Sequence, residues 1–191
     1  MAKSLATLGA VAFGAALTFG TLAEAQDACA EITDSTERLA CYDAANAPPD
    51  PGDWQALEDE GSLAIALRAA TPIACSPFLP IERPILLVRC QDNTTSVIFS
   101  TRACRFASSG QQGAVSLDGG DFEDADFLSG DNDRALGAWV GNQSVPLARE
   151  MVEAETMRVR AIPQSGTPFT ARFDLAGFGV ALAPIRETCQ W

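Results

Sequence analysis

The apolar positions of the chain are densest in the middle of the sequence. A short, largely apolar run, Ile85–Cys90, is followed by polar turn formers and then by a stretch rich in β-branched and aromatic residues, Thr94–Ser100. This order is typical of a buried antiparallel β-hairpin. Because side chains alternate along a strand, we expect Leu86, Val88 and Cys90 to share one face of the sheet.

A second hairpin is predicted further along the chain. Met157–Ala161 and Phe169–Leu175 alternate strictly between apolar and polar residues, and Pro163–Pro168 between them is rich in turn formers. Such alternation is typical of strands with one face in the core and one in water. The outer face would then carry the charged residues Arg158, Arg160, Arg172 and Asp174. We expect these charges to pair across the strands.

Shorter patterns predict the rest of the sheet region. Strands are expected at Leu63–Ala70, Val115–Leu117 and Ala135–Val140. A proline is typical of the first position of a helix, so we expect a short helix over Pro146–Ala154. Cys75 stands between two prolines, which predicts a loop or an edge strand at that point.

The C-terminal region carries apolar residues at helical spacing. They are Leu175, Phe178, Leu182, Ile185 and Cys189. This stripe predicts a helix that packs on the sheet, with a kink or a new start at Pro184. Such a helix would carry Cys189 towards Cys90. The predicted fold is mainly β with flanking helices, as an antiparallel β-sandwich-like or curled sheet closed by a C-terminal helix.

The first residues have the organisation of a secretory signal peptide. A basic start is followed by an apolar, small-residue-rich stretch, Leu5–Leu22, and by Ala23-Glu24-Ala25, which fits the A-x-A cleavage pattern. We expect removal of residues 1–25 and export to the periplasm. The alternative is an N-terminal membrane anchor, which the cleavage pattern does not favour. No later stretch of the sequence is long and apolar enough to span a bilayer.

The segment after the cleavage site predicts a small helix stapled by a disulfide. Asp34 or Ser35 can cap a helix here, and Glu37 stands three residues after Asp34, as in a capping box. Cys29 and Cys41 are close enough in sequence to bond and so to stabilise the segment. The prolines and glycine that follow predict an extended linker. The expected organisation is a signal peptide at 1–25, a stapled helical segment at 26–46, a linker at 47–53 and a β-rich domain at 54–191.

Six cysteines lie after the predicted cleavage site. They are Cys29, Cys41, Cys75, Cys90, Cys104 and Cys189. An even number of cysteines in an exported chain predicts disulfides, although six cysteines allow about fifteen pairings. A metal site is the alternative, but the chain has no histidine and no C-x-x-C pair. We consider one set of pairs in particular, Cys29 with Cys41, Cys90 with Cys189, and Cys75 with Cys104.

Charge and composition exclude several classes of binding partner and of catalysis. The chain carries a formal net charge of −12, and Lys3 is its lone lysine. Such a chain is a poor candidate for binding nucleic acid or anionic lipid surfaces. The absence of histidine excludes Ser-His-Asp and Cys-His catalysis, and no glycine-rich nucleotide motif occurs. We therefore expect no enzyme activity, no cofactor and no bound metal.

The most acidic segment, Asp118–Asp133, is expected to form a long exposed loop. Its acidic residues are Asp118, Asp121, Glu123, Asp124, Asp126, Asp131 and Asp133. These carboxylates could bind calcium, but the residue order of an EF-hand loop is missing, so solvated charges are favoured. A carboxylate-dependent cell-wall hydrolase is the enzymatic alternative, with Asp121, Glu123, Asp124 and Asp126 as its candidate groups.

Three motifs together resemble one family. The first is Cys29-x-x-Ile32 followed by Arg38-Leu39-Ala40-Cys41-Tyr42-Asp43. The second is Leu87-Val88-Arg89-Cys90-x-x-Asn93-x-Thr95, and the third is Phe173-Asp174-Leu175-Ala176-Gly177-Phe178 with Cys189-Gln190-Trp191. In this order they resemble the type VI secretion-associated accessory proteins called TagO or VasI.

The resemblance implies an exported bacterial protein encoded with a contractile injection machine. It supports the pairs Cys29–Cys41 and Cys90–Cys189, and it carries over no catalytic residue. The expected function is a non-enzymatic periplasmic accessory that contacts proteins of the secretion apparatus or the cell envelope. Arg38, Tyr42 and the charged face of the second hairpin are candidate contact surfaces. One alternative is a β-sandwich binding module that resembles the invasion-associated locus B proteins, which share a Leu-x-Gly-Phe segment before a last helix.

Overall fold

The computed structural model describes residues 28–59, 61–108 and 113–191. The chain divides into two compact units, the first of which ends at Pro48. The predicted signal peptide, residues 1–25, and its cleavage site lie outside the described residues. Within those residues, no helix combines the length and the apolar character that a membrane crossing requires.

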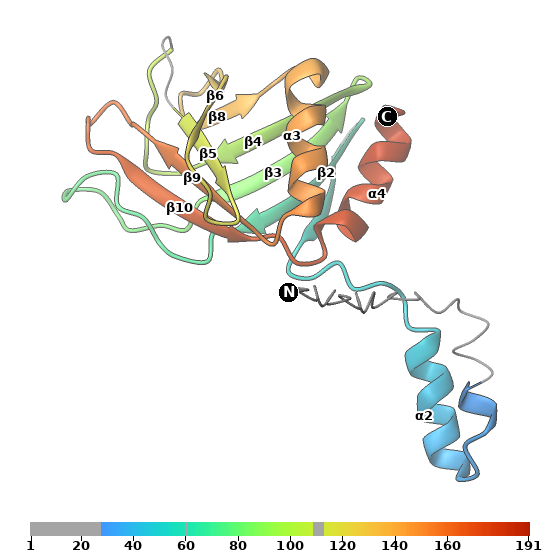
Figure 1. The fold of residues 1–191 in the computed structure, drawn as a ribbon. Coiled ribbons are helices and arrows are strands. Elements are labelled where there is room, and N and C mark those ends of the chain that lie inside the picture. Colours follow the sequence, from blue (N-terminus) through green and yellow to red (C-terminus); the bar gives the residue numbers. More distant parts are fainter. Residues whose placement is uncertain (1–27, 60, 109–112) are drawn as a thin grey trace, which may run out of the picture. The chain divides into compact units, whose positions relative to one another are not determined.

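In the first unit, the main described element is one helix, α2 (Ser35–Ala45), drawn in Figure 1. Asp34 caps it, because the Oδ1 atom of Asp34 accepts two backbone N–H groups of the first turn at 2.9 Å. A disulfide joins Cys29 to Cys41 within the helix. No residue of α2 is buried, so no apolar core stabilises this helix. The Asp34 cap and the disulfide stabilise it instead.

The second unit contains two antiparallel sheets (Figure 1). The six-stranded sheet has the order β1-β2-β3-β4-β8-β7, formed by β1 (Gln55–Asp59), β2 (Ser62–Arg68), β3 (Ile85–Gln91), β4 (Thr94–Ser100), β8 (Ala135–Ala138) and β7 (Leu128–Ser129). The four-stranded sheet has the order β10-β9-β5-β6, formed by β10 (Phe169–Asp174), β9 (Thr156–Ala161), β5 (Gly113–Leu117) and β6 (Glu123–Ala125). The fold is mainly β, as predicted.

The hairpin of β3 and β4 forms the centre of the six-stranded sheet. Asp92 and Asn93 connect the two strands with φ angles of 51° and 56°. Left-handed conformations at both positions give the two-residue turn that matches the twist of a hairpin. Leu86, Val88 and Cys90 point into the core with 0%, 0% and 2% of their surface exposed, which confirms the predicted face.

Aromatic side chains join the two sheets. Phe99 of β4 lies 5.9 Å from Phe169 and 6.2 Å from Phe173, both in β10, measured between ring centroids. Phe106, in the segment after β4, lies 6.4 Å from Phe99. Each of these rings is buried, so the inner faces of both sheets share one apolar core.

Two helices cover the rest of this inner face. They are α3 (Gly141–Glu153) and α4 (Phe178–Cys189), and α4 lies beside β2 and β3 (Figure 1). Ser144 Oγ of α3 donates to the carbonyl oxygen of Thr95 at 2.6 Å. Trp191 Nε1, just past α4, donates to Thr95 Oγ1 at 2.7 Å. The closing C-terminal helix is therefore present, as predicted.

Pro146 lies inside α3, and Pro184 lies inside α4. α3 begins at Gly141, so the expected start at Pro146 is wrong. Pro146 is the sixth residue of this helix, so its missing N–H leaves the carbonyl of Asn142 without an intrahelical donor, and Asn142 is exposed to water. α4 continues through Pro184 without a new start. Pro184 lies on the exposed side of the helix, where water can satisfy the carbonyl that loses its donor.

The sequence patterns missed three short strands. β1 was not predicted, and β6 and β7 lie within the acidic segment that was expected to be a loop throughout. The sequence of β1 does not alternate between apolar and polar residues, which is the pattern that marks a strand. All of its residues are exposed in the structure. β6 and β7 are three and two residues long, and pairing with β5 and β8 creates them.

Candidate functional site

The outer face of the four-stranded sheet carries three arginines. In β9 and β10, Arg158 lies opposite Arg172, and Arg160 lies opposite Thr170. The expectation that these strands pair opposite charges is wrong, because the register places one arginine across from another. None of the three arginines forms an ion pair with a carboxylate of the described residues.

One aromatic ring lies against two of these arginines. The guanidinium carbons of Arg158 and Arg160 lie 4.9 and 4.4 Å from the ring centroid of Phe122. Arg158 Nη2 also donates to Ser116 Oγ at 2.7 Å and to the carbonyl oxygen of Gly120 at 2.8 Å. Cation–π contacts position arginine side chains without neutralising their charge. We call Phe122, Arg158, Arg160 and Arg172 the arginine face.

The outer face of the six-stranded sheet is hollowed into a groove of about 660 Å³. Across its floor, the register sets Ala66 beside Leu87, Leu87 beside Ile98, and Ile98 beside Gly137. The small residues in β2 and β8 leave room for the hollow between larger neighbours. We call this surface the outer groove, whose lining includes Leu57, Leu87, Arg89, Ile98, Leu128 and Trp139.

Trp139 forms one wall of the outer groove. Its indole lies over Gly137 and Gly130, where an added Cβ atom would come within 3.1 Å of the ring. Trp139 Nε1 donates to the carbonyl oxygen of Leu128 at 2.8 Å, and Ser96 Oγ donates to the carbonyl oxygen of Trp139 at 3.1 Å. The two glycines and these hydrogen bonds fix the indole against the sheet.

Arg89 is the cation of the outer groove. It lies in β3 between Ala64 of β2 and Ser96 of β4, and its guanidinium carbon is 5.9 Å from the ring centroid of Trp139. Its Nε is buried and has no hydrogen-bond partner, and it forms no ion pair with the described carboxylates. The groove therefore combines apolar surface with one cationic donor whose hydrogen-bonding capacity is not fully used.

The candidate contact residues of the first unit have different environments. Arg38 is half-buried, and its Nη1 donates to the carbonyl oxygen of Ile32 at 3.1 Å. Tyr42 is also half-buried, whereas Leu39 is 61% exposed. Arg38 therefore helps to hold the segment before α2, and Leu39 offers the larger apolar surface.

The acidic residues proposed for a hydrolase or for calcium do not converge. Asp121, Glu123, Asp124 and Asp126 are all exposed, and they border a hollow of about 420 Å³ against α3. Among the described residues, no three carboxylates bring their oxygens within 4.8 Å of one another. These four side chains therefore lie at the surface in contact with solvent.

Asp118 in the same segment has a structural role that the sequence did not indicate. Its Oδ1 accepts the backbone N–H groups of Glu155 and Thr156 at 2.9 and 2.8 Å. Its own φ is 46°, in the left-handed region that aspartate tolerates better than most residues. Asp118 therefore joins the turn after β5 to the start of β9.

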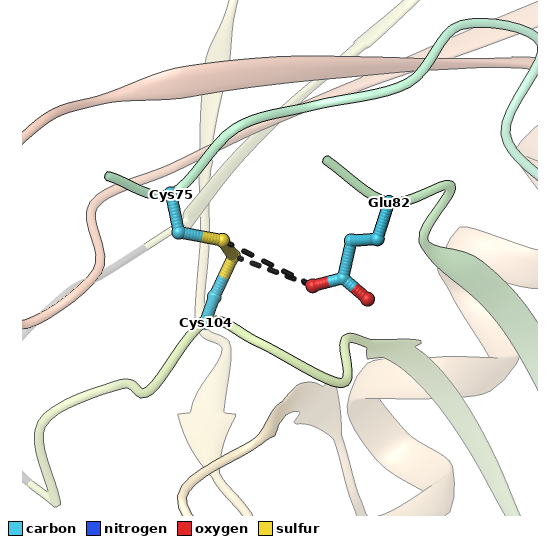
Figure 2. A group of neighbouring side chains, drawn as sticks. All are labelled: Cys75, Glu82 and Cys104. Carbon is cyan, nitrogen blue, oxygen red and sulfur yellow. Dashed lines mark hydrogen bonds between the residues drawn. A yellow bond between two sulfur atoms is a disulfide. The ribbon is translucent and has the colours of Figure 1, made fainter. Parts of the chain in front are cut away.

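Figure 2 shows a carboxylate placed against a disulfide. Glu82 Oε1 lies 4.0 Å from Cys75 Sγ and 3.9 Å from Cys104 Sγ, and the two sulfurs are bonded to each other. The same carboxylate accepts the backbone N–H groups of Arg102 at 2.7 Å and Ala103 at 2.8 Å. Because both sulfurs are oxidised, this group ties the loop before β3 to the segment after β4.

All six cysteines are paired in the structure. The disulfides are Cys29–Cys41, Cys75–Cys104 and Cys90–Cys189, with no free cysteine among the described residues. These are the three pairs considered from the sequence. Since disulfide sulfurs are not nucleophiles, the cysteines supply no thiol chemistry in this state.

Comparison with known proteins gives one family. The family model described as type VI secretion system VasI, EvfG matches residues 54–191, which is most of the chain. No curated protein matches the sequence, and no solved structure matches the fold. The matched residues include both sheets, both helices of the second unit, the arginine face and the outer groove. The chain therefore belongs to the VasI family of type VI secretion system proteins.

Proposed function

We propose that this protein is an exported, non-enzymatic accessory of a type VI secretion system. It acts in the periplasm through contacts with protein components of the apparatus or with the cell wall. Family membership supports the association with the secretion system. The A-x-A pattern at Ala23-Glu24-Ala25 and the three disulfides support export, because disulfides persist in oxidising compartments.

The arginine face gives the strongest support for the proposed contact function. The chain has a net charge of −12, yet its outer β9–β10 face gathers three arginines against one acidic residue, Asp174. Arg160 and Arg172 are exposed, and Arg158 is half-buried. Like charges directly across a ladder are unfavourable in the isolated protein. A partner that supplies carboxylates would remove this repulsion and form charge-assisted hydrogen bonds with the guanidinium groups. The face therefore fits an acidic surface on an apparatus protein or the carboxylates of wall peptides.

The chemistry of the chain supports a role without catalysis. Histidine is absent, and the cysteines are in disulfides. The exposed carboxylates of the β6 region lack the rigid enclosure that paired catalytic carboxylates need. The second unit is cross-linked by disulfides and carries two candidate binding surfaces, the arginine face and the outer groove.

Charge reversal tests this function. A strain lacking the protein is complemented with the wild type, with the double variant Arg160→Glu/Arg172→Glu, or with the control Arg134→Glu. All three residues are exposed, but Arg134 lies outside the arginine face. We expect the double variant to lose secretion activity and to recover no apparatus protein in a periplasmic pull-down, while the control behaves as wild type. Equal activity of all three forms at equal periplasmic levels would refute the proposal.

The outer groove favours a second candidate function, that of a binding module. Its apolar lining and single unpaired cation have the character of a ligand site. The two functions use different faces, so one protein can perform both.

A further inference from the structure

The outer groove is lined with apolar side chains where the outer face of a sheet of this kind is usually polar. An antiparallel sheet packs one face on the core and turns the other to water. β3 instead carries Ile85 and Leu87 on its outer face as well as apolar residues on its inner face. At the rims of the groove, Leu57 is 47% exposed and Leu128 is 55% exposed. None of these residues belongs to the buried core. A ligand that covered them would remove their apolar surface from water, which is favourable.

We infer that the outer groove binds one molecule with a single acyl chain and an anionic head group, and that Arg89 receives the head group. The acyl chain lies along Leu87 and Ile98, against the indole of Trp139. The head group accepts hydrogen bonds from the terminal N–H groups of the Arg89 guanidinium, whose charge no described carboxylate pairs. A carboxylate suits this donor, because arginine binds carboxylates through parallel N–H groups.

Charge in and around the groove restricts the head group. Arg89 is the one cation among the residues that line it, and Asp131 lies in the lining as well. The whole chain has a net charge of −12, which disfavours adsorption to an anionic membrane surface. The site therefore fits a single monoanionic molecule more closely than it fits a bilayer.

Backbone hydrogen bonding distinguishes an acyl chain from an extended peptide. The four strands β2, β3, β4 and β8 form the floor, and each is paired on both sides. Their backbone N–H and C=O groups are directed at neighbouring strands and offer nothing to a ligand above them. A peptide strand laid in the groove would bury its own polar backbone groups without partners, which is costly. An acyl chain has no such groups.

Calorimetric titration of the purified mature protein tests the inference. The probes are dodecanoate, dodecanol and dodecyltrimethylammonium. The two ionic probes are used below their micelle concentrations, and dodecanol is used below its solubility limit. We expect one dodecanoate to bind per chain, at least ten-fold more tightly than dodecanol, with dodecyltrimethylammonium weakest. Equal affinities for the three probes, or no saturable binding of dodecanoate, would overturn the inference.

Three variants locate the site. Arg89→Met keeps an apolar stem and should remove the preference for dodecanoate over dodecanol while leaving the affinity for dodecanol nearly unchanged. Ala66→Phe should fill the groove and weaken both probes at least ten-fold. Arg160→Met removes an arginine from the other sheet and should change neither. Thermal unfolding midpoints within a few degrees of wild type would show that the variants are folded.

Two further results would overturn the inference that the outer groove binds an acyl chain through Arg89. If Arg89→Met still prefers dodecanoate, the head group is bound elsewhere and the assignment to Arg89 is wrong. If no amphiphile saturates the groove but Ala66→Phe abolishes recovery of an apparatus protein in the pull-down, the groove is a protein-docking surface and the inference fails. Neither result depends on the arginine face, so the proposed contact function stands or falls separately.

Discussion

Cys90 and Cys189 are 99 residues apart in the sequence, and a disulfide holds their Cα atoms 5.8 Å apart. Cys90 is in β3, at the centre of the six-stranded sheet, and Cys189 is the last residue of α4. The bond therefore fastens the C-terminal helix to the inner face of the sheet. Both surfaces proposed to bind partners lie on the outer faces of the body that this bond closes.

Removal of this disulfide should destabilise the second unit. For Cys90→Ala/Cys189→Ala we expect a loss of about 2–5 kcal/mol in the free energy of unfolding, because the bond closes a long loop in the unfolded chain. Urea unfolding followed by tryptophan fluorescence measures this loss. The matched control is Cys29→Ala/Cys41→Ala, whose bond lies in the first unit. It should leave the unfolding of the second unit unchanged, and an equal loss in both variants would contradict the account.

Asp118 should contribute to stability through its two backbone hydrogen bonds. Asp118→Ala removes the acceptor for the N–H groups of Glu155 and Thr156 and places alanine at a positive φ. We expect a loss of roughly 1–3 kcal/mol in the free energy of unfolding. Asp118→Asn keeps an acceptor oxygen and tolerates the same backbone conformation, so it should cost less than half as much. Equal losses in the two variants would show that the hydrogen bonds are unimportant.

Gly137 should be intolerant of a side chain, because the Trp139 indole occupies that space. A Cβ atom there would lie 3.0 Å from the carbonyl oxygen of Val97 and 3.1 Å from the indole. Gly137→Ala should lower stability by about 1–3 kcal/mol and shift the fluorescence of the displaced indole. Gly141→Ala is the control, since nothing lies within 4 Å of its Cβ position. Thermal unfolding of both variants decides the point, and a neutral Gly137→Ala would show that the wall of the groove is mobile.

Glu82 should protect the Cys75–Cys104 disulfide from reduction. Its carboxylate lies within 4.0 Å of both sulfurs and repels an attacking thiolate. We expect Glu82→Gln to speed reduction of this bond by dithiothreitol several-fold at low salt, and less so at high salt, where charges are screened. Mass spectrometry of alkylated peptides follows each bond separately, and Cys29–Cys41 in the same molecule is the control. An unchanged rate, or acceleration that high salt does not reduce, would exclude the electrostatic explanation.

Much of the fold could be predicted because its patterns are local. The apolar and β-branched runs around Asp92 and Asn93 indicate the central hairpin, and the apolar stripe that ends at Cys189 indicates the last helix. The short strands and the start of α3 could not be predicted in the same way. β6 and β7 exist because β5 and β8 pair with them, and a pattern within two or three residues carries no period.

The candidate surfaces were harder to predict, because they depend on register and on distant residues. Alternation placed Arg158 and Arg172 on an outer face, but only the pairing of β9 with β10 sets them opposite each other. Nothing in the sequence indicates that Phe122 packs against Arg158, or that Trp139 lies over Gly137. The apolar run of β3 predicted a buried hairpin strand, whereas Ile85, Leu87 and Arg89 on its outer face are half-buried.

Site-specific photo-crosslinking in secretion-competent cells tests the central claim most directly. A photoreactive residue at Thr170, which is exposed and lies opposite Arg160 on the arginine face, is compared with one at Val180 on the exposed side of α4. The account predicts that Thr170 forms a covalent adduct with an apparatus protein or wall peptide, that Val180 does not, and that Arg160→Glu/Arg172→Glu abolishes the adduct. No adduct from Thr170, or one that survives the charge reversal, would contradict it.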